Sequence, residues 1–220
     1  MTHLLFNEEN NTLYGASYKD GSIVKVSFIN NKFSNLKVVH EGGKCHEVLI
    51  HEKKIGIINI EKDIYSIYDL DLNYLDSISL PTKTGARHGL WDKDILYIVT
   101  EYSNELFKIE NKTLVDRIKT IKETSKSNCA TLLMDSNYIY VSNRGEDTIA
   151  RISYKDKLKY IDNHEVFGMH SRHMIFDNTN NYIISLNKNS NNIAIIDKNT
   201  FELVLNIPYE KCSGVAIYNI

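Results

Sequence analysis

The sequence predicts an all-β fold assembled from repeats of one four-stranded unit. Each unit reads as an apolar strand, a short turn, a second apolar strand, a polar turn and further strands, and the pattern returns about every 42 residues. The third strands are anchored by Ile23, Ile64, Leu106, Ile149 and Ile193, whose separations are 41, 42, 43 and 44 residues. A repeat of this length is typical of a β-propeller blade, because one twisted four-stranded sheet cannot cover both of its faces alone. We therefore expect about five blades.

The other strands occur in the same order within every unit. First strands are expected at 3–6, 46–50, 87–91, 130–134 and 172–176, and second strands at 13–16, 55–58, 96–99, 139–142 and 182–185. Outer strands are expected at 36–39, 75–78, 115–118, 158–161 and 203–207, and they are less apolar than the inner ones. That gradient suits solvated sheet edges. No window of useful length shows the helical spacing of apolar residues.

The repeat continues past the fifth unit. Residues 213–218 resemble the first strand of a sixth unit, which predicts a C-terminal strand that closes the propeller. Residues 4–6 already supply a first strand at the other end. Two alternatives therefore stay open: the C-terminal strand displaces them, or an incomplete ring closes as a homo-oligomer. Because no linker or composition shift interrupts the repeat, we expect residues 1–220 to form a single domain.

Charge and composition restrict the class of partner. The chain carries 26 basic and 28 acidic residues, interleaved, for a net charge of −2. No basic stripe marks a nucleic-acid interface, and no amphipathic basic stretch or long apolar run marks a membrane. The first residues lack the basic and apolar regions of a signal peptide, so the prediction is a cytoplasmic protein.

Three cysteines, Cys45, Cys129 and Cys212, open repeats and stand 84 and 83 residues apart. Their odd number and the absence of a CxxC pair argue against disulfides and structural zinc. Packing as small buried residues is the favoured interpretation. A metal-binding or reactive-thiol role is the alternative.

Polar residues gather at one predicted end of the units, which we call the rim. In an up-and-down sheet, the residues that open each first strand share an end with the turn between the second and third strands. The rim residues are His46, Arg87, His88, Arg172 and His173 from the first group, and Tyr18, Lys19, Asp20, Glu101, Asn143, Arg144, Asn187 and Lys188 from the second.

The rim residues suit an acidic ligand. Three arginines, Arg87, Arg144 and Arg172, can form a fork-shaped cradle for phosphate or carboxylate. Glu101 or His46 can activate a water molecule, and an arginine can stabilise an oxyanion. The alternative is that these groups fix turns and pair with one another, Glu101 with Arg87 for example.

The same residues carry a family resemblance. The segments Gly85–His88 with Tyr97–Glu101, Ile139–Ala150, and Ser171–His173 with Asn187–Ile193 resemble the lactonase family of seven-bladed propellers, which includes a 6-phosphogluconolactonase and the carboxy-muconate cyclase. The segment 139–150 matches the family pattern YxSNRGxDSIA almost residue for residue. The similarity extends over nearly the whole chain, which is shorter than the family by about two blades.

The resemblance implies a role for particular residues. The catalytic positions of the cyclase branch correspond to His46, Arg87, Glu101 and Arg172, and substrate-binding positions are expected at His88, Asn143, Arg144, His173 and Asn187. It implies a hydrolase of carbohydrate metabolism that opens a small anionic sugar lactone at the channel mouth, or a related lactone cyclase, with neither a redox cofactor nor a metal. The alternative function is a non-catalytic propeller that binds an acidic metabolite or serves as a protein-interaction platform.

Overall fold

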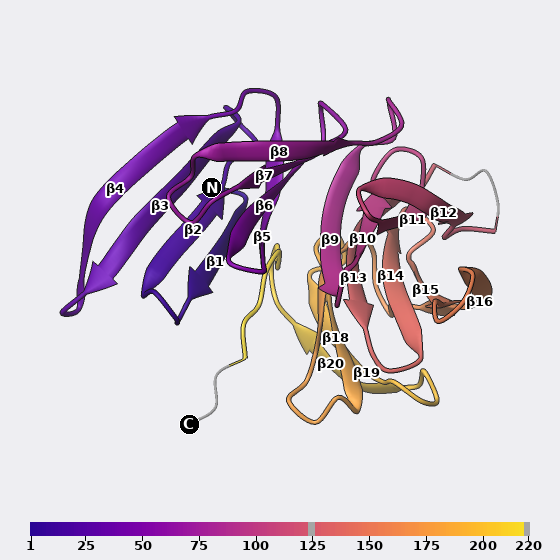
Figure 1. Cartoon of the computed structure of the whole chain (residues 1–220). Helices are drawn as coiled ribbons and strands as arrows, with labels where there is room; N and C mark the ends of the chain where they lie inside the picture. Colours follow the sequence, from indigo (N-terminus) through magenta and orange to yellow (C-terminus); the bar gives the residue numbers. More distant parts are fainter. Residues whose placement is uncertain (123–125, 218–220) are drawn as a thin grey trace. The chain divides into compact units, whose positions relative to one another are not determined.

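All regular elements that the structure describes are β-strands. The computed structural model describes residues 1–122 and 126–217, and no helix in that part of the chain is long and apolar enough to cross a bilayer. The strands form five four-stranded antiparallel sheets, each built from strands consecutive in sequence (Figure 1). This confirms the predicted repeat and the number of units.

Each strand predicted for the five units is present, with bounds within a few residues of the expectation. The first strands are β1 (His3–Asn7), β5 (Cys45–His51), β9 (Ala86–Asp92), β13 (Asn128–Met134) and β17 (Ser171–Phe176). The second strands are β2 (Thr12–Ala16), β6 (Lys54–Asn59), β10 (Ile95–Thr100), β14 (Tyr138–Arg144) and β18 (Tyr182–Asn187). The third strands are β3 (Ser22–Ile29), β7 (Ile64–Tyr68), β11 (Glu105–Glu110), β15 (Thr148–Ser153) and β19 (Asn192–Asp197). The outer strands are β4 (Lys32–His40), β8 (Tyr74–Ser79), β12 (Thr113–Lys119), β16 (Lys159–Glu165) and β20 (Leu203–Pro208).

The chain divides into two compact units. Unit 1 contains residues 1–98 and 109–114, and unit 2 contains residues 99–108 and 115–220. The third sheet, β9 to β12, contributes to both. The expectation of a single domain over 1–220 stays a prediction.

Adjacent sheets bury their apolar faces against each other inside each unit. In unit 1, Tyr14 and Ile23 of the first sheet join Val48 and Ile57 of the second sheet in one fully buried cluster. In unit 2 the corresponding cluster joins the sheets β13–β16 and β17–β20, and its members include Tyr140, Ile149, Met174, Ile183, Ala194 and Ile196. The apolar inner strands predicted from the sequence therefore form the core.

A buried asparagine lies at or next to the end of the second strand in three of the sheets. Asn59, Asn143 and Asn187 are all 0% exposed. The Nδ2 of Asn143 donates to the Thr120 carbonyl at 3.0 Å, and the Nδ2 of Asn187 donates to the Val166 carbonyl at 2.8 Å. Each amide thus ties the loop that leaves one sheet to the inner strands of the next.

The prediction of a closing C-terminal strand is wrong for the described residues of that segment. Residues 213–217 form no strand, and Tyr218 lies outside the described residues. A strand needs a neighbouring edge to accept its backbone bonds. Here the first sheet already has its own first strand, β1, in register with β2 from His3–Ala16 to Asn7–Thr12, so the C-terminal segment does not replace it.

The asparagine ties predict a measurable loss of stability. Replacing Asn187 with alanine is expected to lower the free energy of unfolding by about 2 kcal/mol, because the buried Val166 carbonyl loses its donor. Urea denaturation followed by circular dichroism measures the change. The matched control is Asn199→Ala, an exposed position in the same unit, with an expected change within about 0.5 kcal/mol. Equal losses in the two variants would contradict the assigned role.

Candidate functional site

Two predicted catalytic residues occupy β-bulges at equivalent points of their sheets. In the β5–β6 ladder Cys45 pairs with Asn59 and Glu47 with Ile58, so His46 is the extra residue. In the β17–β18 ladder Ser171 pairs with Asn187 and His173 with Leu186, so Arg172 is the extra residue. A bulge bends its strand and re-aims a side chain, and such bulges are over-represented beside active sites. The local geometry therefore sets His46 and Arg172 apart from the regular in-and-out alternation.

The bulge in β5 helps to form a group of polar side chains in unit 1. We call His3, Tyr18, His46, Glu47 and His88 the histidine cluster. The rings of His46 and His88 lie 4.8 Å apart between centroids and nearly perpendicular, and the ring of Tyr18 meets His46 at 6.2 Å. Tyr18 lies in the turn between β2 and β3, whereas His46 opens β5. The prediction that these two kinds of position share one end is confirmed here.

Glu47 is the centre of the histidine cluster. Its side chain is 7% exposed, and its Oε1 lies 2.7 Å from the Nδ1 of His88. The other oxygen, Oε2, accepts the backbone N–H of Gly89 at 2.6 Å. An ionised Glu47 carboxylate accepts a hydrogen bond from the Nδ1 of His88, and in the neutral tautomer with its proton on Nδ1 the lone pair lies on Nε2. This arrangement orients an imidazole so that Nε2 can accept a proton.

Arg87 lies one residue before His88 in β9. It is the second residue of its strand, as His46 is in β5, and only 2% of its surface is exposed. Burying a guanidinium costs free energy that hydrogen bonds or an anion must offset. The structure therefore gives Arg87 a buried position at the start of β9, within unit 1.

Unit 2 holds the other predicted catalytic residues. The Nη2 of Arg144 lies 3.1 Å from the Oε1 of Glu101, and the same nitrogen donates to the Cys129 carbonyl at 3.1 Å. Asn128 donates to the backbone carbonyl of Glu101 at 3.0 Å. Glu101 lies in the turn after β10, whereas Asn128 opens β13, so this contact again joins the two predicted kinds of rim position. Pairing between rim side chains, the alternative set out above, is realised in Glu101 and Arg144.

A concentration of positive charge surrounds His170. Burial lowers the pKa of His170 below its usual value, and the charges of Arg144, Arg172 and Lys188 lower it further, whereas Asp147 acts in the opposite direction. We call Arg144, His170, Arg172 and Lys188 the cationic cluster. A site in which cations hold an imidazole neutral is also one that attracts an anion.

The positions of the remaining predicted residues give less support for direct contact with a substrate. His173 is half-buried in β17, on the strand that carries Arg172. Asn143 and Asn187 are fully buried and bonded to protein groups, and Asn187 also accepts from the Ser185 hydroxyl at 3.0 Å. This geometry supports a structural role for the two amides, because a side chain with no exposed surface meets a substrate only after rearrangement.

The predicted set therefore divides between the two units. His46, Arg87 and His88 belong to unit 1, and Glu101, Arg144 and Arg172 belong to unit 2. The convergence of all six at one opening stays a prediction. Glu47 and His170 are functional candidates that were not predicted from the sequence. Glu47 directly follows His46, so a carboxylate next to a predicted rim position was the available signal.

The cysteines behave as the packing interpretation predicts. All three are buried free thiols. Burial, together with the nearby Glu41 charge, raises the pKa of Cys45 to about 12, and burial also raises that of Cys212. A thiol that stays protonated at neutral pH is neither a nucleophile nor a ready metal ligand.

Comparison with known proteins identifies the family. The family model described as "Lactonase, 7-bladed beta-propeller" matches residues 1–206, so the chain belongs to this lactonase family. It is 25% identical over 170 residues to a 6-phosphogluconolactonase of Bacillus subtilis, covering 67% of this chain. The chain spans about half the length of that curated relative, 49%.

Solved structures share the fold. A protein from Lactobacillus plantarum superimposes with a TM-score of 0.87 at 18% identity, over 94% of this chain and 71% of that one. A periplasmic gluconolactonase of Pseudomonas aeruginosa superimposes with a TM-score of 0.83 at 16% identity, over 96% of this chain and 71% of that one. At these identities the likeness establishes the β-propeller fold.

The cationic cluster predicts how His170 titrates. Replacing Arg172 with glutamine is expected to raise the pKa of His170, because a charge that disfavours the imidazolium is removed. NMR titration of the ring protons, assigned by their loss in His170→Gln, measures the shift. Lys155→Gln, an exposed lysine in the same unit, is the control and is expected to leave the titration unchanged.

The same depressed pKa gives the sign of a stability effect. His170 binds its proton less readily in the folded protein than in the unfolded chain. Its contribution to the free energy of unfolding is therefore fully present above the pKa of the unfolded chain, near 6.5. Stability is then lost as the pH falls from there toward the folded pKa. An unchanged His170 titration in Arg172→Gln would contradict the electrostatic account of the cluster.

Proposed function

We propose that the protein hydrolyses a small anionic sugar lactone, with His88 as general base and Glu47 as the group that orients it. The observation that carries this proposal is the buried 2.7 Å contact between Glu47 Oε1 and His88 Nδ1 in a chain of the lactonase family. The name of the Bacillus subtilis relative, 6-phosphogluconolactonase, supports a phosphorylated sugar lactone as the substrate class.

The proposed reaction needs one proton acceptor and one positive group. His88 Nε2 takes a proton from water while the resulting hydroxide attacks the lactone carbonyl carbon. The ring C–O bond then breaks, and the departing alkoxide takes the proton back from the His88 imidazolium. We assign the stabilisation of the negative charge on the carbonyl oxygen to Arg87, the buried second residue of β9, which is equivalent in position to His46 in β5.

His46 and Glu47 give this base its orientation. Glu47 holds the Nδ1 side of His88 and is itself fixed by the backbone of Gly89. His46, in the first strand of the neighbouring sheet, packs its ring against His88, which limits rotation of the base. Catalysis gains when a reacting group is held in its productive orientation before the substrate arrives.

A non-catalytic metabolite-binding protein is the second candidate. The cationic cluster favours it, because Arg144, Arg172 and Lys188 provide a positive field with or without chemistry. A cytoplasmic location and a homo-oligomeric state stay predictions.

A hydrolysis assay tests the proposal. The purified full chain is expected to open 6-phosphogluconolactone faster than the spontaneous rate, as measured by acid release in a pH-stat. His88→Gln is expected to lower kcat about 10²- to 10⁴-fold, because the general base is lost. Glu47→Gln is expected to lower kcat with little change in KM, because it removes the orienting charge and leaves the side-chain volume.

The matched control is His40→Gln, an exposed histidine in the same unit, which is expected to retain full activity. Thermal denaturation of each variant separates loss of chemistry from loss of fold. A wild-type rate equal to the spontaneous rate on phosphorylated and unphosphorylated lactones would exclude the hydrolase and favour the binding protein.

A further inference from the structure

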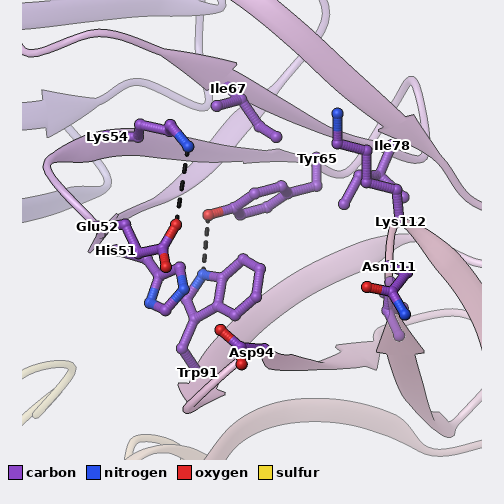
Figure 2. Close-up of a pocket in the computed structure, with 11 residues that line it drawn as sticks. His51, Glu52, Lys54, Tyr65, Ile67, Ile78, Trp91, Asp94, Asn111 and Lys112 are labelled. Atoms are coloured by element: carbon purple, nitrogen blue, oxygen red, sulfur yellow. Dashed lines mark hydrogen bonds and ion pairs between the residues drawn. The ribbon is translucent and has the colours of Figure 1, made fainter.

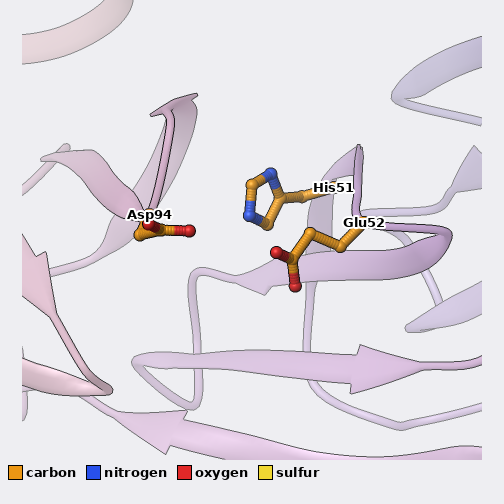
Figure 3. Close-up of side chains that lie close together, drawn as sticks. All are labelled: His51, Glu52 and Asp94. Atoms are coloured by element: carbon orange, nitrogen blue, oxygen red, sulfur yellow. The ribbon is translucent and has the colours of Figure 1, made fainter.

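The far end of β5 carries a second group of polar side chains that the proposed hydrolysis does not use. β5 begins at the histidine cluster and ends at His51, where the turn to β6 follows. There, His51 and Glu52 face Asp94, which lies in the turn between β9 and β10 (Figure 3). Nitrogen and carboxylate ligand atoms of the three side chains all lie within 4.8 Å of one another.

We propose that His51, Glu52 and Asp94 bind a divalent transition-metal cation of the Zn²⁺ class. Two ligands that both bind zinc at about 2.1 Å in tetrahedral geometry stand roughly 3.5 Å apart, so the three groups need to approach by about 1 Å. Glu52 and Asp94 are exposed and free to change rotamer over that range. One imidazole with two carboxylates is a donor set that suits zinc, whereas calcium and magnesium prefer oxygen ligands alone.

The imidazole of this site is held in place by its neighbours. The ring of His51 stacks on Trp91 with 4.0 Å between centroids and an interplanar angle of 5°. The indole Nε1 of Trp91 donates to the hydroxyl of Tyr65 at 3.1 Å, the contact drawn in Figure 2. Residues that orient a metal ligand lower the cost of binding, because less freedom is lost when the cation arrives.

Tyr65 is positioned by a glycine. A Cβ added to Gly56 would lie 1.7 Å from the Tyr65 hydroxyl oxygen, so no larger residue fits at this point of β6. Tyr65 itself is 2% exposed, and burial raises its pKa to about 12, which keeps the hydroxyl protonated. The support of His51 therefore extends through Trp91 and Tyr65 into the buried face of the second sheet.

The backbone also directs the carboxylate of Glu52. Glu52 and Lys53 have φ angles of 46° and 58°, a left-handed conformation that joins β5 and β6 by a tight two-residue turn. Lys54 Nζ lies 3.8 Å from the Glu52 carboxylate and partly offsets its charge (Figure 2). An exposed ion pair of this kind is weak, so it does not prevent a divalent cation from taking the carboxylate.

A cavity adjoins the three ligands. It measures about 180 Å³ and is lined by both polar and apolar residues, among them His51, Glu52, Tyr65, Trp91 and Asp94. Three protein ligands leave at least one position of a four-coordinate zinc ion for water or another small donor. The cavity supplies space for that donor beside the cation.

Metal titration of the untagged full chain tests the site. After removal of metal with EDTA, Zn²⁺ is expected to bind saturably with one equivalent per chain in isothermal titration calorimetry. Co²⁺, a paramagnetic probe, is expected to quench the fluorescence of Trp91, because this tryptophan is the single one in the chain and stacks on His51. Ca²⁺ and Mg²⁺ are expected to bind much more weakly.

Variants of the two exposed carboxylates identify the ligands. Glu52→Gln and Asp94→Asn are each expected to weaken Zn²⁺ binding at least about tenfold and to leave the melting temperature of the metal-free protein unchanged. Glu61→Gln, an exposed carboxylate elsewhere in the same unit, is the matched control and is expected to bind as the wild type does. Absence of saturable binding, equal affinity in the Asp94→Asn variant, or tighter binding of Ca²⁺ than of Zn²⁺ would overturn the proposal.

Discussion

The burial of the apolar inner strands between neighbouring sheets is the constraint on which the rest of the structure depends. A four-stranded sheet whose second and third strands are apolar on both sides has to pack against a neighbouring sheet on each side. Inside unit 1 this joins Tyr14 to Ile57, and inside unit 2 it joins Tyr140 to Ile183. The outer strands lie beyond that contact and remain largely exposed, as β20 does over its whole length. The polar side chains of the candidate site therefore lie near strand ends and in turns.

The strands could be predicted from the sequence because the repeat shows the same pattern five times. An ambiguous segment such as residues 158–161 gains its assignment from its place in the period. The closing strand at 213–217 could not be decided in this way. Its apolar pattern matches a first strand, but a strand also needs a free edge to pair with, and no pattern within the segment reports one.

The site was predictable in its location and less so in its residues. Tyr18 next to His46, and Glu101 next to Asn128 and Arg144, follow from counting strand ends. Asn143 and Asn187 show the limit of that reasoning. An asparagine that ties a loop and one that contacts a ligand have the same polarity and spacing, and only burial distinguishes them. Glu47 was overlooked because regular alternation places it opposite His46, whereas the bulge alters how both side chains are directed.

The bulges also affect how the sequence of such a protein can change during evolution. A bulged residue contributes no regular bond to the ladder, so exchanging its side chain leaves the pairing of the sheet intact. His46 and Arg172 occupy this position in separate sheets, one with an imidazole and the other with a guanidinium. The repeated sheets thus provide several equivalent bulge positions at which the side chain can be exchanged. Recombination between repeats can bring new reactivity to a strand end while the apolar interior is inherited unchanged.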